Sequence, residues 1–226
     1  MDLVRNHLIC FASFVLAVSG ATYGTKFLKK RNYLLAAEWL IISLSATNLA
    51  VYLLIEWPPL YHVAHFFDAF TRAFGVPVIG VLGFMTVTHG YKPSVRQDVA
   101  LFALAFGGAA VLETVGSIAP ALPYFYVVTW TCFSIYVAYF VKRLLGVGEK
   151  FHAMTTTVAL VTSQVIACVY DFYKIPGDEH NVLFNFFFMA LLTWAYFIVA
   201  TYYAYCALER AQDPMSGYAR QGSVLT

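Results

Sequence analysis

Residues 33–57, YLLAAEWLIISLSATNLAVYLLIEW, decide the fold of this chain. The stretch is apolar almost throughout, and its two acidic residues, Glu38 and Glu56, stand near its two ends. A helix that crosses a lipid bilayer needs about 20 mostly apolar residues in a row. A backbone surrounded by lipid must also satisfy its own hydrogen bonds, which an α-helix does. The stretch is therefore predicted to be a transmembrane helix.

The rest of the chain repeats this pattern. Of its 226 residues, 61% are hydrophobic and 12% are charged, whereas soluble domains have about 45–50% and about 25%. This composition excludes a water-soluble enzyme, a disordered segment and a nucleic-acid binder. Residues 1–211 are expected to form one transmembrane domain, and residues 212–226 a loose tail. The fold class is predicted to be all-α, a multi-pass membrane bundle of seven transmembrane helices at residues 8–28, 33–57, 65–89, 99–118, 124–145, 154–173 and 181–207.

The distribution of basic residues predicts the orientation of the bundle. Lys and Arg gather in the cytoplasmic loops of membrane proteins. Eleven of the fourteen Lys and Arg residues fall on one side, in the connections after the first, third and fifth spans and in the tail. The N-terminus is therefore expected outside or in a lumen, and the C-terminus in the cytoplasm. The expected location is the plasma or inner membrane, or the endoplasmic reticulum.

Ionisable residues gather in the outer half of the predicted bundle, and such residues usually mark function because they are costly in a membrane. In the third span, Asp68 and Arg72 are four residues apart, so they can form an ion pair on one helical face. Glu113 in the fourth span and Asp171 at the end of the sixth are the candidates for acid–base catalysis. The candidates for ligand binding are Asp68, Arg72, Glu56, His65, His180, Asn185, Gln164 and Trp194.

Structural roles are the alternatives for these residues. The Asp68–Arg72 pair could simply orient its helix, and Glu113 could be a hydrogen-bonded packing residue inside the bundle. In the inner half, Glu38 and His89 are expected near the cytoplasmic surface. Aromatic residues dominate the rest of that half, so the pattern predicts a cup that opens outward over an apolar base.

Metal and cofactor sites are not expected. His62, His65 and Asp68 read H-x-x-H-x-x-D, and Asp171 or His180 could complete a zinc shell. One helix rarely directs three side chains at a single ion, however, so we assign no metal. The last span has no lysine for retinal, and the histidines lack the matching mid-membrane depth that haem ligation needs.

Two turns resemble a known family. Residues 24–36, GTKFLKKRNYLLA, and 116–124, GSIAPALPY, are similar to the corresponding turns of the fungal membrane-bound terpene cyclases of meroterpenoid and indole-diterpene pathways. Those proteins are also small seven-span chains with almost no loops, so the resemblance implies cyclisation of an isoprenoid. The two acids of that family would fall near Thr47 or Asn48 and near residues 193–195. Neither place holds a carboxylate here, so Glu113 or Asp171 would have to substitute.

The leading hypothesis is an outward-facing pocket that binds a hydrophobic, isoprenoid- or sterol-like small molecule, with protonation, cyclisation or isomerisation as its chemistry if it is an enzyme. One alternative is a small-solute or proton-coupled transporter or channel, whose polar track would pass through Gln164, Asn48 and His89. Another is a non-catalytic subunit of a membrane assembly. The expected partners are membrane lipid and the small molecule, without nucleic acid, and the oligomeric state is left open.

Overall fold

The structure is a computed structural model that describes residues 2–172 and 185–212, with side chains described except at residues 2, 3 and 116–118. Within these ranges every regular element is a helix. A π-helical segment, Thr71–Gly80, joins α3 to α4, and a short 3-10 helix, Gly116–Ala121, leads into α6. The α-helices are α1 (Asp2–Lys29), α2 (Tyr33–Ile55), α3 (Pro58–Phe70), α4 (Val81–His89), α5 (Val95–Thr114), α6 (Leu122–Gly146), α7 (Lys150–Val169) and α8 (Phe186–Gln212).

Seven helical runs in the described part of the chain are long and apolar enough to cross a membrane. The third run is Pro58–His89, in which α3, the π segment and α4 follow one another without a break. For the described residues, the predicted all-helical fold and the seven helices suited to span a membrane are therefore confirmed, which supports a multi-pass membrane protein. The predicted tail after Gln212 lies outside the described residues, as do residues 181–184 of the predicted last span.

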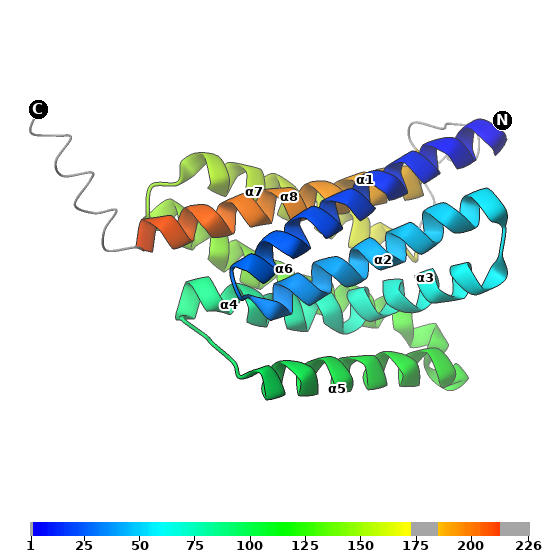
Figure 1. Cartoon of the computed structure of the whole chain (residues 1–226), viewed down its shortest axis with the longest axis horizontal. Coiled ribbons are helices and arrows are strands. Elements are labelled where there is room, and N and C mark those ends of the chain that lie inside the picture. The colour runs from blue at the N-terminus through cyan, green and yellow to red at the C-terminus, as the bar shows by residue number, and fades with distance from the viewer. Residues whose placement is uncertain (1, 173–184, 213–226) are drawn as a thin grey trace, which may run out of the picture.

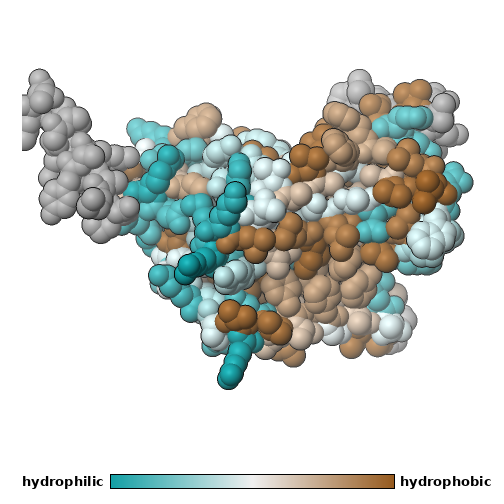
Figure 2. Space-filling model, viewed as in Figure 1, coloured by the Kyte–Doolittle hydropathy of each residue, from teal (hydrophilic) through white to brown (hydrophobic). Residues whose placement is uncertain are grey.

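Successive spans run in opposite directions along the bundle (Figure 1). The connections α1–α2, α4–α5 and α6–α7 lie at one end, together with the last turn of α8. We call this the basic end, because Lys30, Arg31 and Lys92 lie in its connections. Hydrophilic residues gather there, whereas hydrophobic residues cover the middle of the face in Figure 2. The opposite end holds the α2–α3 connection, and the cytoplasmic assignment of the basic end stays a prediction.

Lys30 ties the α1–α2 turn to the last turn of α8. Its ammonium group donates a hydrogen bond to Glu209. Burial acts to lower the pKa of Lys30, but the bond to Glu209 holds that pKa above its ordinary value. The first and last spans are therefore joined by an ion pair at the basic end.

Asn32 fixes the start of α2 against α4. Its side-chain Oδ1 accepts a hydrogen bond from Leu35 N at 3.2 Å, which caps the helix. Its Nδ2 donates to the backbone oxygen of Gly83 at 2.8 Å. A Cβ at Gly83 would lie 2.5 Å from Cγ of Leu35, so the two helices approach as closely as they do because residue 83 has no side chain.

Two segments differ from the sequence prediction. The fourth span was expected to reach residue 118, but α5 ends at Thr114, because Val115 leaves helical geometry with φ −88° and ψ 88°. The third span was expected at residues 65–89. It begins at Pro58 instead, and around Pro77 the chain adopts a π-helix, where the Thr129 hydroxyl of α6 reaches the Arg72 carbonyl oxygen at 3.4 Å. That carbonyl lies five residues before a proline that has no N–H to donate to it.

We predict that the α1–α2 contact depends on Gly20. A Cβ at this position would lie 2.6 Å from the Trp39 carbonyl oxygen and 3.0 Å from Ser43 N, and neither backbone atom can move aside easily. Gly20→Ala should therefore lower the free energy of unfolding by about 1–3 kcal/mol, measured as a lower Tm in detergent. Gly107→Ala in α5 is the matched control, because nothing lies within 4 Å of its Cβ and alanine favours a helix. Equal losses in the two variants would contradict the close contact.

Candidate functional site

A pocket of about 440 Å³ lies inside the bundle, between α1, α2, α3, the π segment, α6 and α8. Its polar lining residues come from the half of the bundle near the α2–α3 connection, and the rest of the lining is largely apolar and aromatic. Volumes of about 300–1,000 Å³ are typical of small-molecule sites. The polar lining includes Ser45, Tyr52, Tyr61, His65, Asp68, Thr71, Arg72, Tyr170 and Asp171, and the apolar lining includes Leu16, Trp39, Ile42, Leu49, Val76, Trp130, Leu191, Trp194, Phe197 and Ile198.

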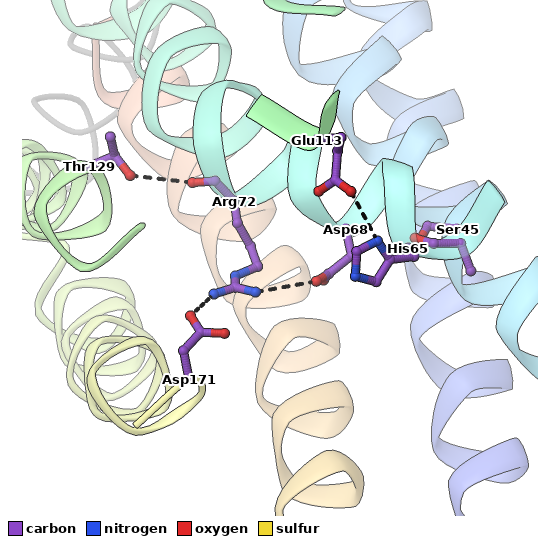
Figure 3. Close-up of polar contacts among 8 residues, drawn as sticks. Ser45, His65, Asp68, Arg72, Glu113, Thr129 and Asp171 are labelled. Carbon is purple, nitrogen blue, oxygen red and sulfur yellow. Dashed lines mark hydrogen bonds and ion pairs between the residues drawn. The ribbon is translucent and has the colours of Figure 1, made fainter. Parts of the chain in front are cut away.

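Arg72 stands at the centre of the polar groups of the pocket. Its Nη1 lies 3.5 Å from Asp68 Oδ2, four residues earlier in the chain, and its Nη2 donates to Asp171 Oδ2 (Figure 3). Its guanidinium carbon also lies 4.1 Å from the ring centroid of Tyr126 and 4.3 Å from that of Tyr170. The side chain is only 10% exposed. The arginine is therefore held by two carboxylates and two aromatic rings.

The predicted Asp68–Arg72 ion pair is confirmed, and its geometry follows from the helix. Pro58 and Pro59 fit the first turn of α3, where a missing N–H costs nothing, and start the helix directly after Trp57. Positions four residues apart then fall on one face. Asp171 comes from the other side of the bundle. It lies in the turn that follows α7, which ends at Val169. The third member of the cluster is thus 99 residues away in sequence.

His65 and Glu113 form a second contact beside this cluster. His65 Nδ1 lies 3.4 Å from Glu113 Oε2, and His65 is also part of the pocket lining (Figure 3). Stacked phenylalanine rings hold α5 against α3, with the Phe70 and Phe106 centroids 4.3 Å apart and their planes at 11°. Glu113 was expected in the outer half of the fourth span, inside the bundle. It lies in the last turn of α5 instead, partly exposed and outside the pocket lining, because the helix ends at Thr114.

Of the other predicted site residues that the structure describes, Trp194 lies in the pocket lining, whereas Glu56, Asn185 and Gln164 do not. Trp194 lines the pocket and stacks on Tyr170, with ring centroids 5.9 Å apart. Glu56 is the exposed C-cap of α2, with a left-handed φ of 53°. Asn185 caps α8, where its Oδ1 accepts hydrogen bonds from the N–H groups of residues 187 and 188 at 3.1 and 3.3 Å. Gln164 joins α7 to α6 through Ser134 Oγ at 2.6 Å. His180 lies outside the described residues.

The proposed zinc alternative has no support in the described part of the chain. There, no three His, Cys, Asp or Glu side chains come together in a way that could hold a metal ion. His62 and His65 are both exposed on α3, and the carboxylates of Asp68 and Asp171 are separated by the Arg72 guanidinium. The acidic groups of the pocket therefore meet a fixed positive charge of the protein itself.

Glu38 is a buried carboxyl group whose direction the sequence did not reveal. It was expected in the inner half, near the cytoplasmic surface, and its side chain is fully buried, because α2 turns this face towards the π segment. A Cβ at Gly75 would overlap both of its carboxyl oxygens. The Thr71 hydroxyl is the polar neighbour of the Glu38 carboxyl group. Neither the hydroxyl nor the carboxyl group makes a hydrogen bond of normal geometry. Thr71 lines the pocket, so Glu38 lies directly behind the pocket wall.

Sequence position alone carried a signal for Glu38. It is a lone carboxylate in the first turns of an otherwise apolar span, which is the setting that marks functional residues in membranes. The direction of the Glu38 side chain could not be predicted, because α2 is apolar on all sides. No polar stripe distinguishes the lipid-facing side of this helix from its buried side.

We predict that Arg72 holds the pocket end of the bundle together. Arg72→Met would leave Asp68 and Asp171 facing each other without a counter-charge, and breaking such a buried pair costs about 3–5 kcal/mol. The Tm in detergent should fall accordingly. The triple variant Asp68→Asn, Arg72→Met, Asp171→Asn should recover most of this loss, because no unpaired charge remains. A single variant as stable as the wild type would contradict the assignment.

We also predict that Glu38 is dispensable for stability. Glu38→Met removes a buried carboxyl group that has no hydrogen-bond partner, so the free energy of unfolding should stay the same or rise by up to about 3 kcal/mol. Asn32→Leu is the contrasting control, because it removes a buried side chain whose hydrogen bonds are all made. If Glu38→Met lowered the Tm as much as Asn32→Leu does, Glu38 would have a partner that stabilises the fold.

Comparison with known proteins gives no assignment: no protein-family model, no curated protein and no solved structure matches the chain. The similarity of residues 24–36 and 116–124 to the fungal terpene cyclases therefore stays an expectation from the sequence.

Proposed function

We propose that this membrane protein binds a hydrophobic or amphipathic small molecule, isoprenoid- or sterol-like in size, in the pocket between α1, α2, α3 and α8. The apolar body of the ligand would lie against Trp39, Leu191 and Trp194. Its polar end would meet Asp68, Arg72 and Asp171. The observation that carries this proposal is an apolar cavity of about 440 Å³ with its charged groups in one half.

The composition of the cavity supports binding. Ligand sites are mostly apolar and aromatic, with a small number of polar groups that fix orientation. Here the aromatic walls are supplied by several helices, and the three tryptophans Trp39, Trp130 and Trp194 are among them. The polar groups are held in fixed positions by the ion pairs of Arg72. A ligand would therefore meet a preformed site, which keeps the entropic cost of binding low.

The base of the pocket supports binding over transport. Ile198 and Phe197 lie at this base, and both are buried. The residues of the proposed polar track occupy separate settings. Gln164 bonds between α6 and α7, Asn48 Nδ2 donates to Leu44 O within α2, and His89 stacks on Tyr139 near the basic end. A buried, apolar base suits a binding pocket better than a conduction path.

Acid–base catalysis is a second candidate, and one observation favours it. His65 lines the pocket while its Nδ1 faces the Glu113 carboxylate at 3.4 Å. An imidazole that is oriented by a carboxylate is the usual arrangement of a general base. In an enzyme built on this pocket, His65 would therefore exchange the proton with the ligand, and Glu113 would orient His65. Asp171 would act as an anchor, because Arg72 already engages it.

Tryptophan fluorescence tests the binding proposal directly. Three of the four tryptophans line the pocket, and the fourth, Trp57, is 57% exposed at the α2–α3 connection. In a Trp57→Phe chain the emission comes from pocket residues alone. We expect 12-bromododecanol to quench this emission saturably in nanodiscs, at about one molecule per chain.

Pocket-filling variants complete this prediction. Leu49→Phe and Ala46→Leu place extra carbon atoms on the pocket wall and should weaken the saturable quenching about tenfold. Leu104→Phe is the matched control, because residue 104 is 75% exposed on the outside of α5. Quenching that rises without saturation, as expected for probe dissolved in the surrounding lipid, would refute the pocket as a binding site.

A further inference from the structure

Among the residues that the structure describes, the charges near the pocket do not balance. Three carboxylates gather there, from Asp68, Asp171 and Glu113, in the part of the chain that the structure describes. In the same described ranges, the basic groups that contact these carboxylates are Arg72 and His65. With the carboxylates ionised, at least one negative charge is left over even if His65 is protonated. If His65 is neutral, two are left over.

Arg72 cannot supply positive charge to a ligand. Its Nη1 and Nη2 point at Asp68 and Asp171, and the Tyr126 and Tyr170 rings pack on its guanidinium group. An anionic head group would therefore have to displace a carboxylate of the protein. Each aspartate engages Arg72 through Oδ2, and within residues 2–172 and 185–212 no hydrogen bond or ion pair is found at either Oδ1. The two aspartate side chains are 27% and 21% exposed, so they keep contact with the space around them.

Aromatic rings line the same end of the pocket. The ring centroids of Tyr52 and Tyr61 are 5.3 Å apart, and the ring centroid of His65 lies 5.9 Å from that of Tyr61. On the opposite wall, Tyr170 stacks on Trp194. Aromatic faces attract cations, with Trp and Tyr among the best, and the attraction grows when the site is shielded from water. Surplus carboxylate and aromatic walls together form a receptor for a positive charge.

We propose that the ligand of this pocket is a cationic amphiphile, with an ammonium head group at Asp68 and Asp171 and an apolar body in the cavity. This inference rests on the proposed function, because it names the chemical class of the molecule that the pocket binds. The ammonium group would contact the Oδ1 atoms of the two aspartates and the tyrosine rings. Arg72 would act as a positioning residue that fixes the spacing of the two carboxylates.

Three probes of equal chain length test this proposal. The Trp57→Phe chain is placed in phosphatidylcholine nanodiscs, and its quenching is measured with 12-bromododecyl-trimethylammonium, 12-bromododecanol and 12-bromododecyl sulfate. Protein-free nanodiscs give the partitioning of each probe into lipid, which is subtracted. We expect the ammonium probe to bind at least tenfold more tightly than the alcohol, and the sulfate to bind more weakly than the alcohol.

Two variants in the same background assign the preference to the aspartates. Asp171→Asn and Asp68→Asn each remove one negative charge, and each should bring the affinity for the ammonium probe to within about threefold of that for the alcohol. The double variant leaves Arg72 uncompensated and should reverse the order, so that the sulfate binds best. Asp98→Asn is the control, because this carboxylate lies in the first turn of α5 at the basic end and should leave the preference unchanged. If only one of the two single variants folds, its probe affinities can still be compared with those of the Trp57→Phe chain.

The outcomes separate this inference from the proposed function. Saturable binding of all three probes with equal affinity would overturn the cationic ligand and leave the binding pocket standing. An ammonium preference that survives in the aspartate variants would overturn the assignment to Asp68 and Asp171. No saturable binding by any probe would refute both proposals.

Discussion

The guanidinium group of Arg72 is the constraint on which the interior of this bundle depends. A charged side chain inside a membrane protein is costly unless its partners are supplied. Here Asp68 supplies one from the same helical run, and Asp171 supplies the other from the turn after α7. The rings of Tyr126 of α6 and of Tyr170 pack on the cation. One side chain thus fixes the third, fifth and sixth spans relative to one another, and the pocket lies between this group and the aromatic base.

The parts of this arrangement that are local in sequence could be predicted. A run of about 20 apolar residues specifies a span whatever its neighbours are, because the bilayer sets the length. All seven spans were predicted for this reason. The observed ends differ from the predicted ends by several residues where helix capping sets the boundary, as at Thr114. The Asp68–Arg72 pair is local too, because a spacing of four residues places both side chains on one helical face.

The groups that meet across the bundle could not be predicted, because helix rotation is invisible in a uniformly apolar span. Asp171 and Glu113 were candidates of equal standing, yet Asp171 bonds to Arg72 while Glu113 contacts His65 near the end of α5. Glu38 illustrates the same limit. Its depth along α2 was readable, but whether it faced lipid, water or the π segment depended on packing that a single sequence does not encode locally.

The π segment changes the face that the later residues of the third span present. A π turn spaces its hydrogen bonds by five residues where an α turn spaces them by four, so residues beyond its first turn are rotated away from the positions that α-helical geometry predicts. Within these ten residues, Arg72 points to the pocket and Gly75 faces Glu38. The same irregular stretch therefore supplies the fixed charge of the site and the close contact behind its wall. π-Helical insertions are frequent at functional sites, and this one lies where the pocket, the buried acid and the ion pairs meet. A regular helix through Pro77 would present a different face to α2 and α6, and the spacing of the two aspartates around Arg72 would change with it.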